Sequence, residues 1–265
     1  WVIMADSKEG DEFGEEHTTI DYGSDVKFVD PWGPYTFWSS LEPYVYSKGA
    51  NLTSFIVGGR VRRFTDQNFP QGKRPRLLGF PHGNQLQFWL TQPEAIAMDV
   101  LSLFLQGYDA TAVYQFPRGY DNRYWSAIAK ANEQIAEYEE FVFKGDVFSD
   151  LTVHPQTPFP SPVKKLFERW LPDENNISLL QIKAYKLDRK MLIAAGNFWE
   201  KANVFFTLNI KGLDDHQQYV VLQADKERYF RPEHAAFWTG RELAQGILLH
   251  GGALRWTFYT VEPFQ

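Results

Sequence analysis

Carboxylate side chains crowd one short segment near the start of the chain. An apolar run, Trp1–Ala5, is predicted to form a buried strand, and the Gly-punctuated segment after it is predicted to be a loop. Two carboxyl groups about 5 to 10 Å apart can act as general acid and base, or as acid and nucleophile, on a glycosidic bond. We predict Asp6, Asp11 and Glu12 as the catalytic candidates, and a solvated acidic loop is the alternative.

The sequence predicts neither a metal nor a cofactor. The acidic loop does not have the ligand spacing of an EF-hand calcium site. The histidines show no i, i+4 pairing and the chain has no cysteine, so a zinc site is not indicated. Gly58-Gly59-Arg60 lacks the spacing of a phosphate-binding loop or a dinucleotide fingerprint, and Gly-X-Ser-X-Gly is absent.

Polar and aromatic residues near the ends of the predicted strands are candidates for binding a substrate. In β/α barrels, the carboxyl ends of the strands line the active site. His82 lies between proline and glycine, where it either hydrogen-bonds a sugar hydroxyl or is a structural turn histidine. Asp121 either caps the following helix or pairs with Arg118 or Arg123. Trp125 is predicted to face the core from that helix. The substrate-binding candidates are Trp32, Trp38, Arg60, His82, Gln115, Arg118 and Tyr120.

The elements that must position these residues alternate between strand and helix in residues 1–145. A capping box in Thr91-Gln-Pro-Glu94 predicts a helix that ends at Gly107, and a longer helix is predicted over 122–143. This alternation predicts parallel strands joined by right-handed crossovers. The predicted strands are Trp1–Ala5, Leu52–Val57, Arg76–Phe80 and Ala110–Phe116.

A different pattern begins after a Pro-rich linker, predicted over residues 146–176. In residues 177–265 the apolar period becomes two, which predicts an antiparallel β-sandwich. Asp188-Arg189 is the predicted turn of its first hairpin. The predicted strands are Ser178–Lys186, Lys190–Gly196, Asn203–Ile210, Tyr219–Ala224, Gly246–His250 and Leu254–Val261.

Three segments carry a resemblance to glycoside hydrolases. Leu101–Pro117 resembles the last helix-to-strand passage of their (β/α)8 barrels, and Met191–Trp199 and Ala253–Val261 resemble the sandwiches appended to amylase-like and galactosidase-like enzymes. The fold class implied is α/β plus all-β, a partial (β/α) barrel followed by an antiparallel β-sandwich. The resemblance implies hydrolysis of an oligo- or polysaccharide, with a second chain or a missing N-terminal segment completing the barrel.

The chain departs from these hydrolases at one strand end. Common retaining barrel hydrolases place a glutamate nucleophile on the penultimate strand, where this chain reads Gly79-Phe-Pro-His-Gly83. The alternative function is therefore a non-catalytic carbohydrate-binding or structural subunit, whose half-barrel a partner chain completes.

Composition narrows the remaining classes of function. Aromatic residues make up 17% of the chain, which suits either a large core or a cleft that stacks on sugars. The net charge of −6 and the lack of a basic stripe argue against nucleic acid. No apolar stretch reaches the ~18 residues of a membrane span. The start at Trp1 suggests a trimmed or fragmentary chain, and we expect an extracellular or periplasmic location.

Overall fold

A computed structural model describes the protein at residues 26–29, 55, 59, 62–63, 66–67, 76–79, 84–85, 89–90, 93–111, 121–157, 178–199, 202–224 and 237–264. The chain divides into two compact units. The first, here called the β/α unit, comprises residues 1–135 and 162–177. The second, called the sheet unit, comprises residues 136–161 and 178–265.

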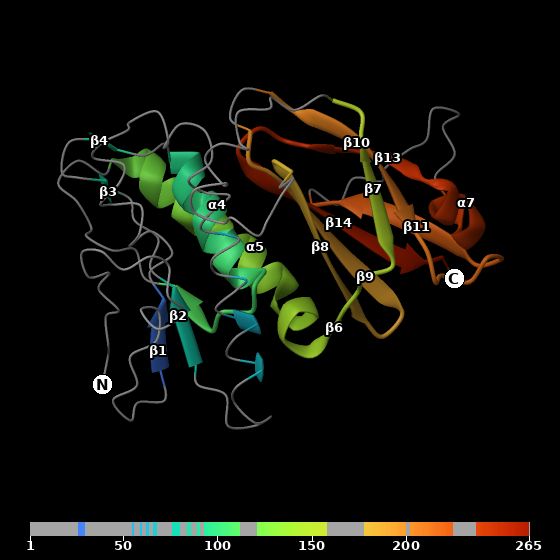
Figure 1. The fold of residues 1–265 in the computed structure, drawn as a ribbon, viewed down its shortest axis with the longest axis horizontal. Helices are drawn as coiled ribbons and strands as arrows, with labels where there is room; N and C mark the ends of the chain where they lie inside the picture. The colour runs from blue at the N-terminus through green and yellow to red at the C-terminus, as the bar shows by residue number, and fades with distance from the viewer. Residues whose placement is uncertain are drawn as a thin grey trace. The chain divides into compact units, whose positions relative to one another are not determined.

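The β/α unit contains a parallel sheet, as its sequence pattern predicts. The strands β1 (Val26–Val29), β2 (Arg76–Gly79) and β5 (Ala110–Thr111) are ordered β1-β2-β5, and both pairings are parallel (Figure 1). Helix α4 (Pro93–Phe104) lies between β2 and β5 in the chain, which makes this segment a strand–helix–strand crossover. A short hairpin precedes it, β3 (Asn84–Gln85) and β4 (Trp89–Leu90).

In this unit, one predicted strand is wrong, and an observed strand of the parallel sheet was not predicted. The strand predicted at Leu52–Val57 is wrong, because Phe55 is helical. A short apolar run fits a buried strand and a buried helix equally well, and periodicity alone does not separate them. Strand β1 was not predicted, and the predicted strand Trp1–Ala5 lies outside the described residues.

Helix α4 is buried on nearly all sides, and it ends as the sequence predicts. Gly107 has φ of +74°, the left-handed conformation that glycine adopts without strain. Its N–H donates to the Phe104 carbonyl (2.7 Å), and the Tyr108 N–H donates to the Leu103 carbonyl (3.2 Å). These two bonds form a Schellman cap. The Arg62 guanidinium donates to the Gly107 carbonyl (2.6 Å), so the last turn is held from outside as well.

The long helix α5 (Asn122–Lys144) confirms the predicted helix, and its buried face agrees with the predicted one only in part, at the half-buried Ile128, Ile135 and Val142. Tyr124, Ala131 and Tyr138 are buried at seven-residue spacing, whereas Trp125 and Ala129 are exposed. The prediction weighted apolar side chains and therefore passed over two tyrosines, which bury their rings while the hydroxyl remains available for a hydrogen bond.

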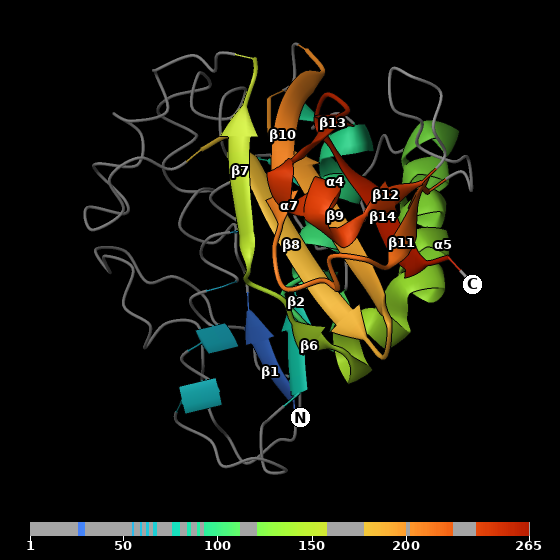
Figure 2. The same cartoon turned by 90° about the vertical axis from the view of Figure 1, so that its right-hand side faces the viewer.

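The sheet unit is built from two antiparallel sheets, and all six strands predicted after residue 177 are present. One sheet has the order β12-β11-β14-β9-β8-β6 and the other β13-β10-β7. Figure 2 shows β7, β10 and β13 side by side. The strands are β6 (Asp146–Val147), β7 (Leu151–Pro155), β8 (Leu180–Leu187), β9 (Lys190–Asn197), β10 (Val204–Ile210), β11 (Gln218–Gln223), β12 (Trp238–Thr239), β13 (Ile247–Gly251) and β14 (Arg255–Pro263).

Four elements of this unit were not predicted: strands β6, β7 and β12 and helix α7. Strands β6 and β7 lie in the range expected to be a linker, and β7 pairs with β10. The density of prolines after residue 154 hides the strand, although Pro155 is tolerated at its end because β7 is an edge strand. Helix α7 (Gly240–Gln245) was missed too, and it begins with a capping box between Thr239 and Glu242.

The two sheets share one hydrophobic core. Alternate residues of each strand point into it, as the period-two pattern requires. From the three-stranded sheet come Val204, Phe206 and Leu208 of β10, and from the six-stranded sheet come Ile193 of β9 and Tyr259 of β14. Leu243 of α7 is fully buried in the same core, so this helix anchors to both sheets.

Candidate functional site

The candidate site of the β/α unit is the edge of its sheet at which the parallel strands have their carboxyl ends. Since β1, β2 and β5 run in the same direction, their carboxyl ends lie at a common edge of the sheet. Several predicted binding residues follow these strands in the chain. All the predicted site residues lie outside the described residues: Asp6, Asp11, Glu12, Trp32, Trp38, Arg60, His82, Gln115, Arg118 and Tyr120.

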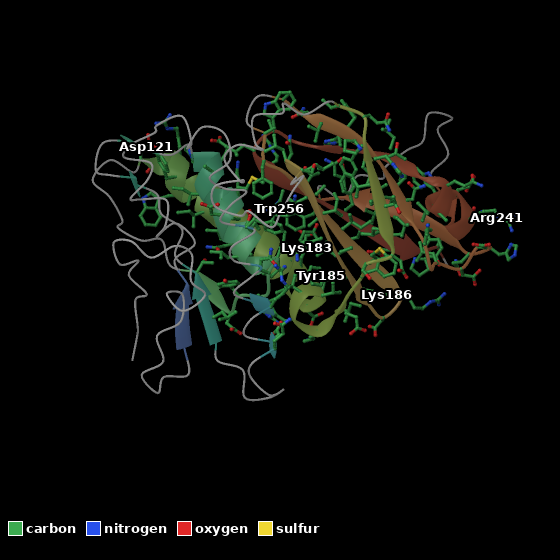
Figure 3. The ribbon with its side chains drawn as sticks, viewed as in Figure 1. Asp121, Lys183, Tyr185, Lys186, Arg241 and Trp256 are labelled. Carbon is green, nitrogen blue, oxygen red and sulfur yellow. The ribbon has the colours of Figure 1, made fainter. Side chains whose placement is uncertain are left out.

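After β5, the next residues along the chain that the structure describes are those that begin helix α5. Asp121 lies at the amino-terminal end of the helix (Figure 3). Its Oδ1 accepts a hydrogen bond from the Arg123 backbone N–H (2.9 Å), so the predicted cap is confirmed. The predicted pairing with Arg123 is also present, because the guanidinium Nη2 lies 2.7 Å from Oδ2. Asp121 therefore serves both roles that the sequence left open.

This pair restricts the chemistry available to Asp121. The hydrogen bond from the Arg123 side chain, together with the one from its backbone, lowers the pKa of the Asp121 carboxyl, and the carboxylate in turn raises the pKa of Arg123. A general acid needs a carboxyl group that stays protonated near neutral pH, which requires a raised pKa. The lowered pKa therefore does not suit Asp121 to the role of a general acid.

Two aromatic residues next to this pair have opposite environments. Tyr124 is buried, and burial raises the pKa of its hydroxyl. Trp125 is 52% exposed, which corrects the expectation that it belongs to the core. The prediction failed because Tyr124, one position earlier, occupies the inward-facing position of the first turn. A large exposed indole in the first turn of α5 is a feature that the sequence pattern did not identify.

The opposite, amino-terminal end of β5 carries a polar cluster in which Tyr108 is buried and Asp109 is exposed. Asp109 Oδ2 accepts from the Leu77 N–H (2.7 Å), while the Asp109 N–H donates to the Leu77 carbonyl (2.9 Å). Tyr108 is buried beside Leu77, and burial raises the pKa of its hydroxyl while nearby Arg62 opposes that shift. Since this cluster ties β5 to β2 at the end remote from the strand carboxyl termini, its role is structural.

Helix α4 also buries two polar side chains that the sequence analysis passed over. Asp99 and Ser102 are nearly inaccessible, and their spacing of three residues places them on one face of the helix. Both interact with other residues of the protein. The signal in the sequence is an aspartate inside an otherwise apolar helix, since buried carboxylates require partners.

Metal-binding and membrane-spanning features are absent from the part of the chain that the structure describes. Its histidine, aspartate and glutamate side chains form no group of three or more suited to a metal ion. Within the same residues, no helix is both long and apolar enough to cross a bilayer.

Comparison with known proteins finds similarity at the level of solved structures. No known protein family and no curated protein matches the sequence. The chain is similar to a xyloglucanase of glycoside hydrolase family 44 from Paenibacillus polymyxa, with 10% identity, a TM-score of 0.40, and coverage of 89% of this chain and 41% of that one.

Two further structures are similar to the same degree. The family 30 endoxylanase of Clostridium papyrosolvens has 11% identity and a TM-score of 0.39, with 86% of this chain and 54% of that one covered. The α-L-arabinofuranosidase of Thermotoga maritima has 8% identity and a TM-score of 0.38, with 91% and 53% covered. All three are glycoside hydrolases, and this chain spans about half of their length.

Proposed function

We propose that the chain is part of a glycoside hydrolase and contributes a partial β/α barrel with an appended antiparallel β-sandwich. The observation that carries the proposal is the order of the two architectures. A parallel sheet with a crossover helix comes first, and two antiparallel sheets around a shared core follow. In β/α barrels the active site lies at the carboxyl ends of the strands, and β1, β2 and β5 share such an edge. The inference is one of fold-level analogy.

The proposed chemistry uses two carboxyl groups of the acidic segment. One, drawn from Asp6, Asp11 and Glu12, donates a proton to the glycosidic oxygen, and a second stabilises the developing charge, as nucleophile or through an activated water. Trp32 and Trp38 stack on the sugar, while His82 and Arg118 hydrogen-bond its hydroxyls. The substrate is an oligo- or polysaccharide, and we place the protein outside the cytoplasm, in an extracellular or periplasmic location.

The test is hydrolysis by the purified chain. Reducing-sugar release is measured on xyloglucan, xylan, arabinan and starch, and on aryl glycosides. We expect release from at least one substrate, and a loss of about 10²–10⁴-fold in kcat for those of Asp6→Asn, Asp11→Asn and Glu12→Gln that remove the acid or the base.

Glu15→Gln is the matched control, because it removes one carboxylate from the same segment without touching a catalytic candidate. Its activity should equal that of the wild type. Full activity in all three candidate variants would reject the site assignment. No hydrolysis of any substrate by the wild-type chain would reject the enzyme proposal for this chain alone.

The second candidate function is a non-catalytic carbohydrate-binding or structural subunit, completed by a partner chain. Strand β2 ends at Gly79, and the four residues after it, Phe80-Pro-His-Gly83, contain no carboxylate. This departs from the glutamate that common retaining barrel hydrolases carry there. Gel filtration and intact mass of native material test whether a partner completes the half-barrel, since a co-purifying chain of similar size is expected of a split barrel. Hydrolysis by that complex would reject the non-catalytic function.

A further inference from the structure

The outer face of the three-stranded sheet exposes apolar and polar side chains together. Phe205 of β10 and Leu248 of β13 are each 50% exposed. Register places Phe205 opposite His250, and Thr207 opposite both His154 and Leu248. We call this the Phe205 surface; its residues are His154, Gln156, Phe205, Thr207, Leu248 and His250. From strand spacing it measures about 7 Å along the strands and 10 Å across them.

The backbone that carries the aromatic ring is fixed from one side. The Phe205 N–H donates to the Thr157 hydroxyl (3.0 Å), and the Phe205 carbonyl accepts from the Gln156 N–H (2.8 Å). The Gln156 carboxamide in turn donates to the Thr207 hydroxyl (3.2 Å), which orients a polar group beside the ring. A ligand that binds here does not have to order these groups first.

The backbone of the neighbouring His250 is fixed in a similar way. The Tyr259 hydroxyl donates to the His250 carbonyl (2.8 Å) and accepts from the His250 N–H (3.3 Å), so the core holds this strand in place. The imidazole of His250 meets the Phe205 ring edge-on, with centroids 6.4 Å apart. Two rings thus lie on adjacent strands of one face.

The strands that form this face carry no residue of fixed charge. Strands β7, β10 and β13 contain no aspartate, glutamate, lysine or arginine, whereas such residues are 23% of the chain. In the six-stranded sheet, β8, β9 and β14 each carry charged residues, whereas β11 and β12 carry none. A ligand matched to the Phe205 surface is therefore uncharged, offers an apolar face to a ring, and exchanges hydrogen bonds with hydroxyl, imidazole and carboxamide groups.

A neutral sugar has these properties, because its C–H groups form an apolar face and its hydroxyls surround it. We infer that the Phe205 surface binds an uncharged polysaccharide chain, with Phe205 stacking on a sugar ring. This surface lies on the sheet unit and requires no residue of the acidic segment, so the inference goes beyond the proposed hydrolytic function and does not depend on it.

Affinity electrophoresis under native conditions tests this inference. The full chain is run in gels that contain xyloglucan, arabinoxylan or mixed-linkage β-glucan, and polygalacturonate serves as an anionic comparison. We expect retardation by at least one neutral polymer and none by polygalacturonate. Phe205→Ala should raise the apparent Kd at least about tenfold, as loss of a central aromatic contact does.

Three variants make the result specific. Phe205→Tyr keeps the ring and should keep the affinity. Phe205→Leu keeps an apolar side chain without the ring and should behave like Phe205→Ala. Phe143→Ala removes a similarly exposed phenylalanine (47%) from α5 and should bind as the wild type does. The unfolding temperature of each variant shows that it is folded.

Several outcomes would overturn the inference. They are no retardation by any of the three neutral polymers, unchanged binding by Phe205→Ala, or equal binding by Phe205→Leu and the wild type. A dimer that Phe205→Ala dissociates, seen by light scattering, would assign the face to a second copy of the chain instead. Aryl-glycoside hydrolysis by Phe205→Ala is measured in parallel, because it reports on the proposed function separately.

Discussion

The two sheets of the sheet unit differ in how their outer faces are used. On the six-stranded sheet, several residues that point away from the shared core are nonetheless buried, among them Leu192, Trp256 and Phe258. Tyr138 of α5 stacks on Phe258, with centroids 4.9 Å apart and planes 16° from parallel. On the three-stranded sheet the corresponding face exposes Phe205 and Leu248.

This difference shows at which positions core packing explains an apolar residue and at which it does not. Strand β9 contains a continuous apolar run, Met191–Ala195, as expected of a strand buried on both faces. Strand β10 alternates in burial, so its pattern predicts a polar residue at position 205, where phenylalanine stands instead. A large apolar residue at an outward position of a one-sided sheet is the informative exception, because core packing does not explain it.

The largest expected effect comes from replacing one phenylalanine on each face with alanine. Phe258→Ala removes a fully buried ring and its stacking with Tyr138, so the free energy of unfolding should fall by about 3–5 kcal/mol. Phe205→Ala should change it by no more than about 0.5 kcal/mol. Urea unfolding followed by tryptophan fluorescence measures both, and similar losses for the two variants would contradict the comparison.

An intermediate effect is expected at Gly196, where the covered face is tightest. A Cβ at this position would lie 2.7 Å from the Trp256 ring, so Gly196→Ala should cost about 1–3 kcal/mol of unfolding free energy. Combining it with Trp256→Phe makes room for the methyl group. The double variant should therefore lose less than the sum of the two single losses, and strict additivity would show that the ring is not the obstacle.

The smallest effect is expected at the exposed ion pair of the β/α unit. Arg123 lowers the folded-state pKa of Asp121, so the pair stabilises the protein above the unfolded-state pKa of about 3.9, and this contribution is lost as the pH falls through the folded value. Asp121→Asn keeps the helix cap but removes the charge. Its unfolding temperature should lie slightly below that of the wild type at pH 7 and converge with it in acid. A gap that persists in acid, below the folded-state pKa of Asp121, would contradict this.

Local patterns allowed the secondary structure of much of the chain to be predicted, and long-range pairing limited the rest. The hairpin of β8 and β9 and the helix α5 follow from turn residues and periodicity alone. Strand β7 was missed because its partner β10 is distant in the chain, and nothing in its short, proline-flanked sequence shows that the partner exists. The helix at Phe55 was missed because a short apolar run is ambiguous.

The candidate site was less accessible to prediction than the fold. The roles of Asp121 as cap and ion-pair partner follow from local spacing. The exposure of Trp125 depends on which side of α5 packs, and the tyrosines that decide this were not counted as apolar. The assignment of Asp6, Asp11 and Glu12 stays a prediction. The Phe205 surface became visible only through the pairing of three strands from distant parts of the chain.

That pairing also sets an order of assembly. Strands β8 and β9 are joined by the two-residue turn Asp188-Arg189, with Asp188 at φ of +53°, and such hairpins close within microseconds. The bond between Gln156 and Thr207 instead joins residues 51 positions apart, so the entropy of closing a long loop must be overcome first. We therefore expect the three-stranded sheet to form late, and the Phe205 surface to exist only in molecules that have completed folding.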